Sequence, residues 1–248
     1  MTEDQTSHGP ASRAPGIDSQ WLLQALTTEH FTLQTARSAT IADSNGRSAL
    51  YLSTVSGAVV ALAFIGQVAQ VSQPFFLFAL ALLPALFLLG VLIYLRLLQC
   101  AIEDLFYARA INRIRRYYLG LGPDAARWFL LAGHDDPAGA MASMGLSATR
   151  RHLLSHTATM VAVVASIIGG AFVALAAGAL GVGRLPVAAS ATVGVLVALA
   201  STALFWRHQA RRWHAAEQAV QPLFPSPTAP SDATPHRRPH DLPAGNAQ

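Results

Sequence analysis

The sequence predicts an all-α polytopic membrane protein with two transmembrane helical hairpins, four spans in all, and a cytoplasmic amphipathic helix between them. Its 248 residues are 52% hydrophobic and only 12% charged, which is about half the charged fraction of a soluble domain. Two long apolar blocks interrupt the chain, and nearly all of its basic residues lie outside them. These three observations exclude an ordinary soluble domain.

The N-terminal part divides into a tail and a helical segment. Residues 1–18 are polar and contain proline, so we expect a disordered tail. Residues 19–48 carry apolar side chains at helical spacing, which predicts a cytoplasmic helical segment. Asn45-Gly46 is open to two interpretations, a turn before the membrane or a local loosening of a continuous helix.

The first hairpin is predicted over residues 49–97. No charged residue lies between Arg47 and Arg96, and a single helix over that stretch would be about 70 Å long. A hydrocarbon core is about 30 Å thick, so the chain must reverse once. Proline at position 74, in a polar stretch, marks the reversal and gives spans at 49–70 and 75–97.

The second hairpin is predicted over residues 157–206, where Arg184 is the only charged residue. A glycine- and proline-rich break divides it into spans at 157–180 and 185–206. Residues 207–221 then form the cytoplasmic end of the last helix. Residues 222–248 hold seven of the 14 prolines and are predicted to be a disordered tail.

The segment 98–156 between the hairpins is predicted to be an amphipathic helix followed by a linker. In residues 102–118, apolar side chains fall within an arc of roughly 140°, with charged and amide side chains opposite. Two interpretations are open: a stalk helix packed on its neighbours, or a surface helix whose Arg109, Arg113 and Arg116 bind anionic lipid headgroups. We expect no nucleic-acid partner, because no recognition module accompanies the basic residues.

The distribution of arginine predicts the orientation. Outside the two tails, thirteen arginines precede, separate or follow the hairpins, whereas the two short hairpin loops contain one, Arg184. By the positive-inside rule, both termini and the central segment lie in the cytoplasm of a bacterial inner membrane. The thirteen are Arg37, Arg47, Arg96, Arg109, Arg113, Arg115, Arg116, Arg127, Arg150, Arg151, Arg207, Arg211 and Arg212.

Catalytic chemistry has little support in the sequence. There is no lysine and one cysteine, Cys100, which excludes a P-loop and any site that needs several cysteines. His152 and His156 share a helical face at metal-ligand spacing, but interfacial histidines are the simpler interpretation. We therefore expect a protein that is not an enzyme, with no catalytic, cofactor-binding or metal residues and no cofactor.

Four short motifs carry a resemblance: NGR at 45–47, GQ at 66–67, IEDL with YARAINRIRRYY at 102–118, and HDDP at 134–137. With these motifs the chain resembles a family of uncharacterised actinobacterial four-span integral membrane proteins, over about residues 35–205. The resemblance implies the four-span plan and no activity. In architecture alone, the chain is similar to the SLATT-type membrane effectors of bacterial conflict systems, which are predicted to permeabilise membranes.

Small residues recur at every fourth position in three spans, and such stripes let helix backbones approach closely in lipid. We expect them to pack helices, either within one chain or between copies. The predicted packing residues are Gly57 and Ala61 in the first span, and Gly170, Ala174, Gly178, Gly194 and Ala198 in the second hairpin.

Glu103 lies on the apolar arc one turn beyond the second span, where an unpaired charge costs several kcal/mol. We expect an interhelical ion pair with one of the basic residues at that depth, unless the helix begins later and Glu103 faces water. The candidate partners are Arg47, Arg150, Arg151, His152, His156 and Arg207.

Taken as a whole, the sequence favours a non-enzymatic integral inner-membrane protein that acts as a self-associating scaffold or interaction module. We expect the protein to contact the lipid bilayer and to form a homo-oligomer. The sequence identifies no other protein partner. The alternative is an oligomeric pore or membrane-permeabilising effector.

Overall fold

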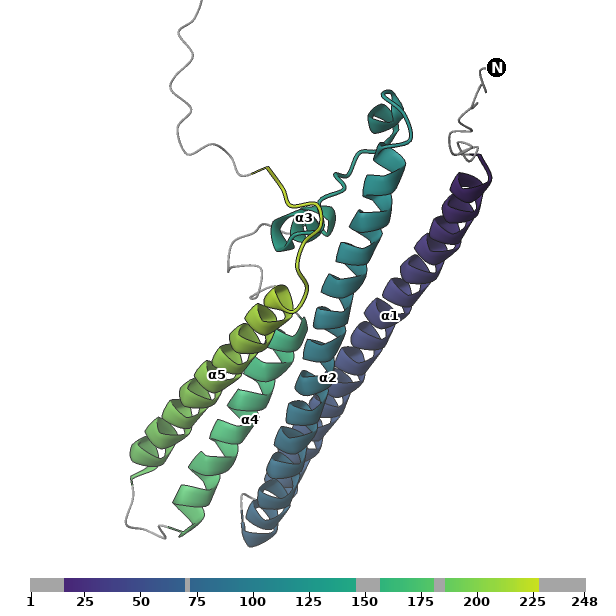
Figure 1. The fold of residues 1–248 in the computed structure, drawn as a ribbon. Helices are drawn as coiled ribbons and strands as arrows, with labels where there is room; N and C mark the ends of the chain where they lie inside the picture. Colours follow the sequence, from purple (N-terminus) through teal and green to yellow (C-terminus); the bar gives the residue numbers. More distant parts are fainter. Residues whose placement is uncertain (1–15, 70–71, 146–156, 181–185, 228–248) are drawn as a thin grey trace, which may run out of the picture.

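The computed structural model describes residues 16–69, 72–145, 157–180 and 186–227 (Figure 1). Within these ranges the chain is helical and contains no strand. Four of the helices are long and apolar enough to cross a membrane, so the predicted all-α, four-span fold class is confirmed. In chain order the elements are α1 (Gly16–Val68), α2 (Gln73–Leu119), the 3-10 helix η1 (Ala125–Trp128), α3 (Pro137–Ser143), α4 (Thr157–Leu180) and α5 (Val187–Gln218).

Helices α1 and α2 form a long antiparallel pair. They contain 53 and 47 residues, which makes them about 80 and 70 Å long, more than twice the thickness of a hydrocarbon core. Both continue beyond the ends of α4 and α5 (Figure 1). We call this continuation the stalk, residues 16–47 of α1 and 98–119 of α2. α1 is helical through Asn45 and Gly46, so the turn interpretation at that position is wrong.

Contacts along the stalk hold α1 against α2. Arg37 Nε lies 2.6 Å from Asp104 Oδ1. Nearer the far end, the Tyr118 hydroxyl donates to Thr27 Oγ1 at 3.4 Å, and the Tyr118 ring meets His30 edge to face. Residues 102–118 therefore form a stalk helix that packs on its neighbour α1, as the first of the two interpretations predicted.

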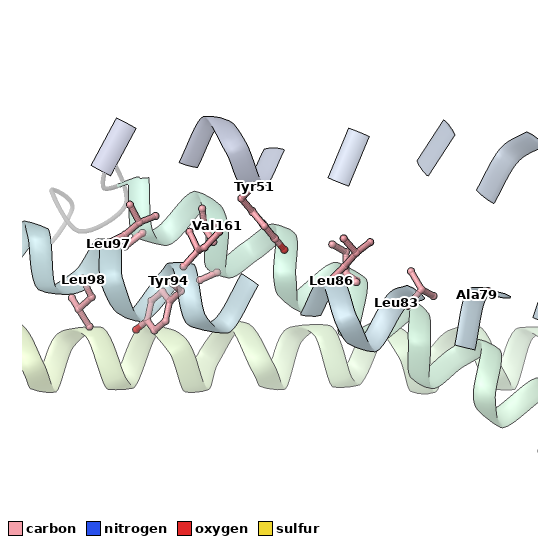
Figure 2. Close-up of a cluster of buried hydrophobic side chains, with 12 residues drawn as sticks. Tyr51, Ala79, Leu83, Leu86, Tyr94, Leu97, Leu98 and Val161 are labelled. Atoms are coloured by element: carbon pink, nitrogen blue, oxygen red, sulfur yellow. The ribbon is translucent and has the colours of Figure 1, made fainter. Parts of the chain in front are cut away.

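The four apolar helices pack in the order α1, α2, α4, α5, with α1 and α5 at opposite edges (Figure 1). α2 packs extensively on both α1 and α4, whereas it touches α5 little. The core lies where α1, α2 and α4 meet, and Figure 2 shows Tyr51, Leu86, Tyr94 and Val161 within it. Burial is greatest in α4 and least in α1, as expected for an edge helix.

Gly90 allows this three-helix contact. A Cβ at this position would lie 2.5 Å from the Tyr51 hydroxyl oxygen and 2.7 Å from Ala165 Cβ. Both distances are far inside van der Waals contact. Tyr51 is fully buried as a result.

Both predicted disordered tails begin or end at the wrong residue. Residues 16–18 belong to α1, because elongating an existing helix adds one hydrogen bond for each residue fixed. Residues 222–227 lie within the described part of the chain, and the backbone N–H groups of Leu223 and Phe224 donate to Asp135. A proline-rich composition carries no information about such an acceptor elsewhere in the chain. Residues 1–15 and 228–248 lie outside the described residues.

Candidate functional site

Arg109 of α2 anchors the C-terminal segment of the chain. Its Nε–H donates to the backbone carbonyl of Asp135 at 2.8 Å, and its two terminal nitrogens donate to the carbonyls of Glu217 and Val220. The residue is 2% exposed, and this burial lowers the pKa of Arg109 from its ordinary value. All three guanidinium nitrogens of Arg109 therefore donate to carbonyl groups of this same chain.

Asp135 is the acidic centre of the same site, and its side chain is fully buried. One carboxylate oxygen accepts from Arg113 Nε and from the backbone N–H of Leu223, and the other accepts from the N–H of Phe224 at 2.7 Å. Burial alone raises the pKa of Asp135, but these hydrogen bonds outweigh it and hold the pKa below its usual value. We call Arg109, Arg113, Asp135 and the backbone of residues 217–224 the Asp135 junction.

Asn112 positions the neighbouring loop and α3. Its Nδ2 donates to the carbonyls of His134 at 2.7 Å and Gly139 at 3.3 Å, and the side chain is fully buried. Gly139 has to be glycine here, since a Cβ would lie 2.5 Å from the His134 carbonyl oxygen. Asp136 caps α3 by accepting from Gly139 N–H, and the Ser226 hydroxyl donates to the same carboxylate oxygen.

An apolar cluster of α2, α3 and α5 lies beside these polar contacts. Leu105 of α2 and Trp213 of α5 are almost completely buried against Ala140 and Met141 of α3. The Trp213 indole N–H donates to Glu217 at 2.9 Å, which satisfies the polar atom of the buried ring. The junction therefore joins three segments that are far apart in the sequence.

The predicted headgroup residues must be corrected. Arg109 is buried and Arg113 is paired with Asp135, so both assignments to lipid are wrong. Arg116 is exposed, with its guanidinium 5.8 Å from the centre of the Phe224 ring. The predicted polar face also fails at Asn112, because α3 and the C-terminal segment cover the side of α2 that α1 leaves open.

Neither of the two candidate partners of Glu103 in the described part of the chain, Arg47 and Arg207, pairs with it. Glu103 pairs with Arg96 of its own helix at 3.5 Å and is 40% exposed in its side chain, so its carboxylate is not dehydrated. Arg47 pairs instead with Asp43, and Arg207 forms no ion pair with any described residue. The pairs that do join α1 to α2 are Asp43 with Arg96 and Arg37 with Asp104. Arg150, Arg151, His152 and His156 lie outside the described residues.

The three stripes of small residues have different surroundings. Gly170, Ala174, Gly194 and Ala198 pack α4 against α5 within one chain, since a Cβ on Gly170 would lie 2.4 Å from the Gly194 carbonyl oxygen. Gly178 lies at a looser point of the same contact, since a Cβ there would lie 4.0 Å from Ser190 Oγ. Gly57 is exposed, and a Cβ there would have no neighbour within 4 Å. Ala61 is half-buried beside it.

No group of three His, Cys, Asp or Glu side chains is placed to hold a metal ion within residues 16–69, 72–145, 157–180 and 186–227. His152 and His156 fall outside these ranges, so the predicted pair is not described. Cys100 is buried beside Asp43, with Sγ 3.8 Å from Oδ2, and burial raises the pKa of this thiol.

Sequence reasoning missed the Asp135 junction. The sequence did contain a signal for it, because the two aspartates of HDDP at 134–137 follow an arginine-rich helix closely. Sequence reasoning used Arg211 and Arg212 of α5 only to predict orientation. It did not identify them as candidate site residues, although both are exposed.

Comparison of the chain with protein-family models, with curated proteins and with solved structures finds no match. Functional assignment therefore rests on the contacts of the chain's own residues.

Proposed function

We propose that this chain is a non-enzymatic scaffold of the bacterial inner membrane that self-associates through the outer face of α1. The observation that carries the proposal is a continuous exposed stripe on this helix. Its members recur at steps of three or four residues, the spacing at which two helices wind around each other. They are Thr35, Ala39, Ala42, Gly46, Ala49, Ser53, Gly57, Val60 and Phe64.

The stripe points away from the rest of the chain. At 100° per residue, its members fall within an arc of about 80°. The buried residues of α1, Thr40, Ser48 and Tyr51, lie on the opposite side. Eight of the nine stripe residues are no larger than valine, so a second helix backbone is able to approach closely along about 44 Å.

Lipid alone does not account for the stripe. Its first part lies in the stalk, in the same turns of α1 that carry the charged residues Arg37, Asp43 and Arg47, and its second part lies in the apolar portion of α1. A surface that keeps the same spacing across this boundary suits a protein partner that crosses it too. A second copy inserted in the same orientation is such a partner, and its α1 runs parallel, so that each position meets itself across a two-fold axis.

Cysteine cross-linking tests this pairing in a Cys100→Ala background. Oxidation of membranes that contain Ala42→Cys is expected to give a disulfide-linked dimer, because two copies of position 42 meet in a parallel pair. Ile41→Cys is the matched control, since residue 41 is also exposed but lies about 120° from the centre of the stripe. Equal cross-linking at both positions would contradict the proposed face.

Gly57→Leu is expected to weaken the dimer at least about tenfold, as bulk on a small-residue seam prevents close backbone approach. The monomer should fold normally, because the space around Gly57 is open within the chain. Ala63→Leu is the control on another exposed face of the same helix. A wild-type chain that stays monomeric in membranes would refute self-association. Loss of membrane potential on expression would contradict the scaffold and favour the pore predicted as the alternative.

The proposed orientation places the stalk in the cytoplasm, by the arginine distribution. In the Cys100→Ala background, Ser72→Cys should react with an impermeant thiol reagent applied to intact cells, and Ala126→Cys only after permeabilisation. Both positions are exposed. The reverse labelling pattern would overturn the orientation.

A further inference from the structure

An apolar groove of about 330 Å³ runs between α2 and α5. Phe87, Val91 and Leu95 of α2 form one wall, and Ser201 and Leu204 of α5 form the other. The groove exists because α2 and α5 each pack on α4 and touch one another little. It lies within the apolar part of the helices, where the surrounding solvent is hydrocarbon.

The stalk end of the groove is polar. The Tyr94 hydroxyl donates its single proton to the Phe205 carbonyl at 2.9 Å, so the hydroxyl acts as the acceptor towards His208 Nδ1, 3.1 Å away. Figure 2 shows Tyr94 extending from α2 towards α5. In this contact Nδ1 of the exposed His208 ring is the donor, which fixes the ring against Tyr94 at the stalk end of the groove.

Two arginines continue this end of the groove. Arg211 and Arg212 lie one turn beyond His208, about 60° to one side and 40° to the other. Both are exposed, and neither forms an ion pair with another residue in the described part of the chain. Arg207 lies at a similar depth but about 100° from His208, outside the line of the groove. The groove therefore has an apolar body and a positively charged mouth.

We propose that this groove binds an anionic phospholipid, with an acyl chain along Val91 and Leu204 and the phosphate at the guanidiniums of Arg211 and Arg212. The apolar walls suit hydrocarbon and exclude a soluble anion as the occupant of the body of the groove. The unpaired guanidiniums complement a phosphate, for which arginine supplies several donors. The groove is formed by α2 and α5 and does not include the stripe on α1. A test of lipid binding is therefore independent of whether the chain self-associates.

Lipid titration of the full-length chain in detergent tests the site, with bound lipid counted by native mass spectrometry. Dioleoyl phosphatidylglycerol should bind more tightly than dioleoyl phosphatidylcholine, which has the same chains and no net charge. An Arg211→Gln/Arg212→Gln variant should weaken phosphatidylglycerol binding by about 25-fold, at about fivefold for each charge. Arg207→Gln is the matched control and should change binding less than about twofold.

The groove itself is tested by Ser201→Trp, which fills it and should remove the bound lipid of either kind. Leu199→Trp adds the same ring on an exposed face of α5 outside the groove and should have no effect. Melting temperatures confirm that each variant is folded, and the double arginine variant tests the site without added bulk. Equal affinity for the two lipids, equal loss in Arg207→Gln, or binding that survives in folded Ser201→Trp would overturn the proposal.

Discussion

Leucine at position 170 is expected to separate α4 from α5 and to unfold the second hairpin. A Cβ at Gly170 would lie 2.4 Å from the Gly194 carbonyl oxygen and 2.9 Å from Ala198 Cβ. The first of these atoms is backbone and has no rotamer by which to move away, so the two helices must part along the contact. Overpacking ordinarily costs about 1–3 kcal/mol, and a backbone clash at the centre of a helix pair should lie at or above the top of that range.

The measurement is the melting temperature of the purified chain in detergent, for a graded set of substitutions. Gly170→Ala should lower it less than Gly170→Leu. Gly178→Leu is the control on the same helix, because the nearest neighbour of its Cβ is Ser190 Oγ at 4.0 Å. Gly57→Leu should leave the melting temperature of the monomer unchanged. A Gly170→Leu protein that melts with the wild type would show that α4 and α5 do not pack as described.

Asp135→Asn is expected to release the C-terminal segment from the stalk. The carboxylate accepts from Arg113 and from two backbone N–H groups, and an amide offers one acceptor oxygen in place of two. The substitution also removes the charge opposite Arg113 and places N–H donors against donors. Loss of one partner from a buried ionic contact costs about 3 kcal/mol, which is enough to open a segment held by few other contacts.

Hydrogen exchange of the backbone amides of residues 219–227 measures this release. Exchange should increase in Asp135→Asn and remain at the wild-type rate in Asp124→Asn, a change to a carboxylate that is 80% exposed. Unchanged exchange in Asp135→Asn would mean that the apolar contacts of Trp213 hold the segment without the carboxylate.

Acid should have the same effect as the substitution. The pKa of Asp135 in the folded chain lies below the ordinary value of 3.8, so the folded form binds a proton less readily than the released form. The stabilisation is therefore complete above about pH 4 and is lost as the pH falls through the lower folded pKa. At pH 7 the junction should be fully closed.

The positions of the apolar helices could be predicted from the sequence. Hydrocarbon does not tolerate unpaired charge, so the stretches without charged residues mark the spans wherever the helices pack. The span predicted at 157–180 coincides with α4. The other spans lie within longer helices, because helix elongation continues past the membrane boundary wherever the residues allow it.

The role of each polar residue in the stalk was beyond prediction from the sequence. Arg109 and Arg212 are the same residue type on helices that leave apolar spans, yet one is buried and the other is exposed. The difference lies in Asp135 and the carbonyls of residues 217–220, which are 26 or more positions away from Arg109. Amphipathic spacing shows which residues of one helix share a face. It contains no information about partners that are distant in the sequence.

The stripes of small residues illustrate the same division. In the sequence, Gly57, Gly170 and Gly194 occur in equivalent patterns, and each pattern predicts close approach of two backbones. The local composition determined that these helices are able to pack tightly. Only the tertiary structure decided which of them do so within the chain, because Gly170 and Gly194 face each other whereas Gly57 faces outward, and facing is a property of two helices placed in space.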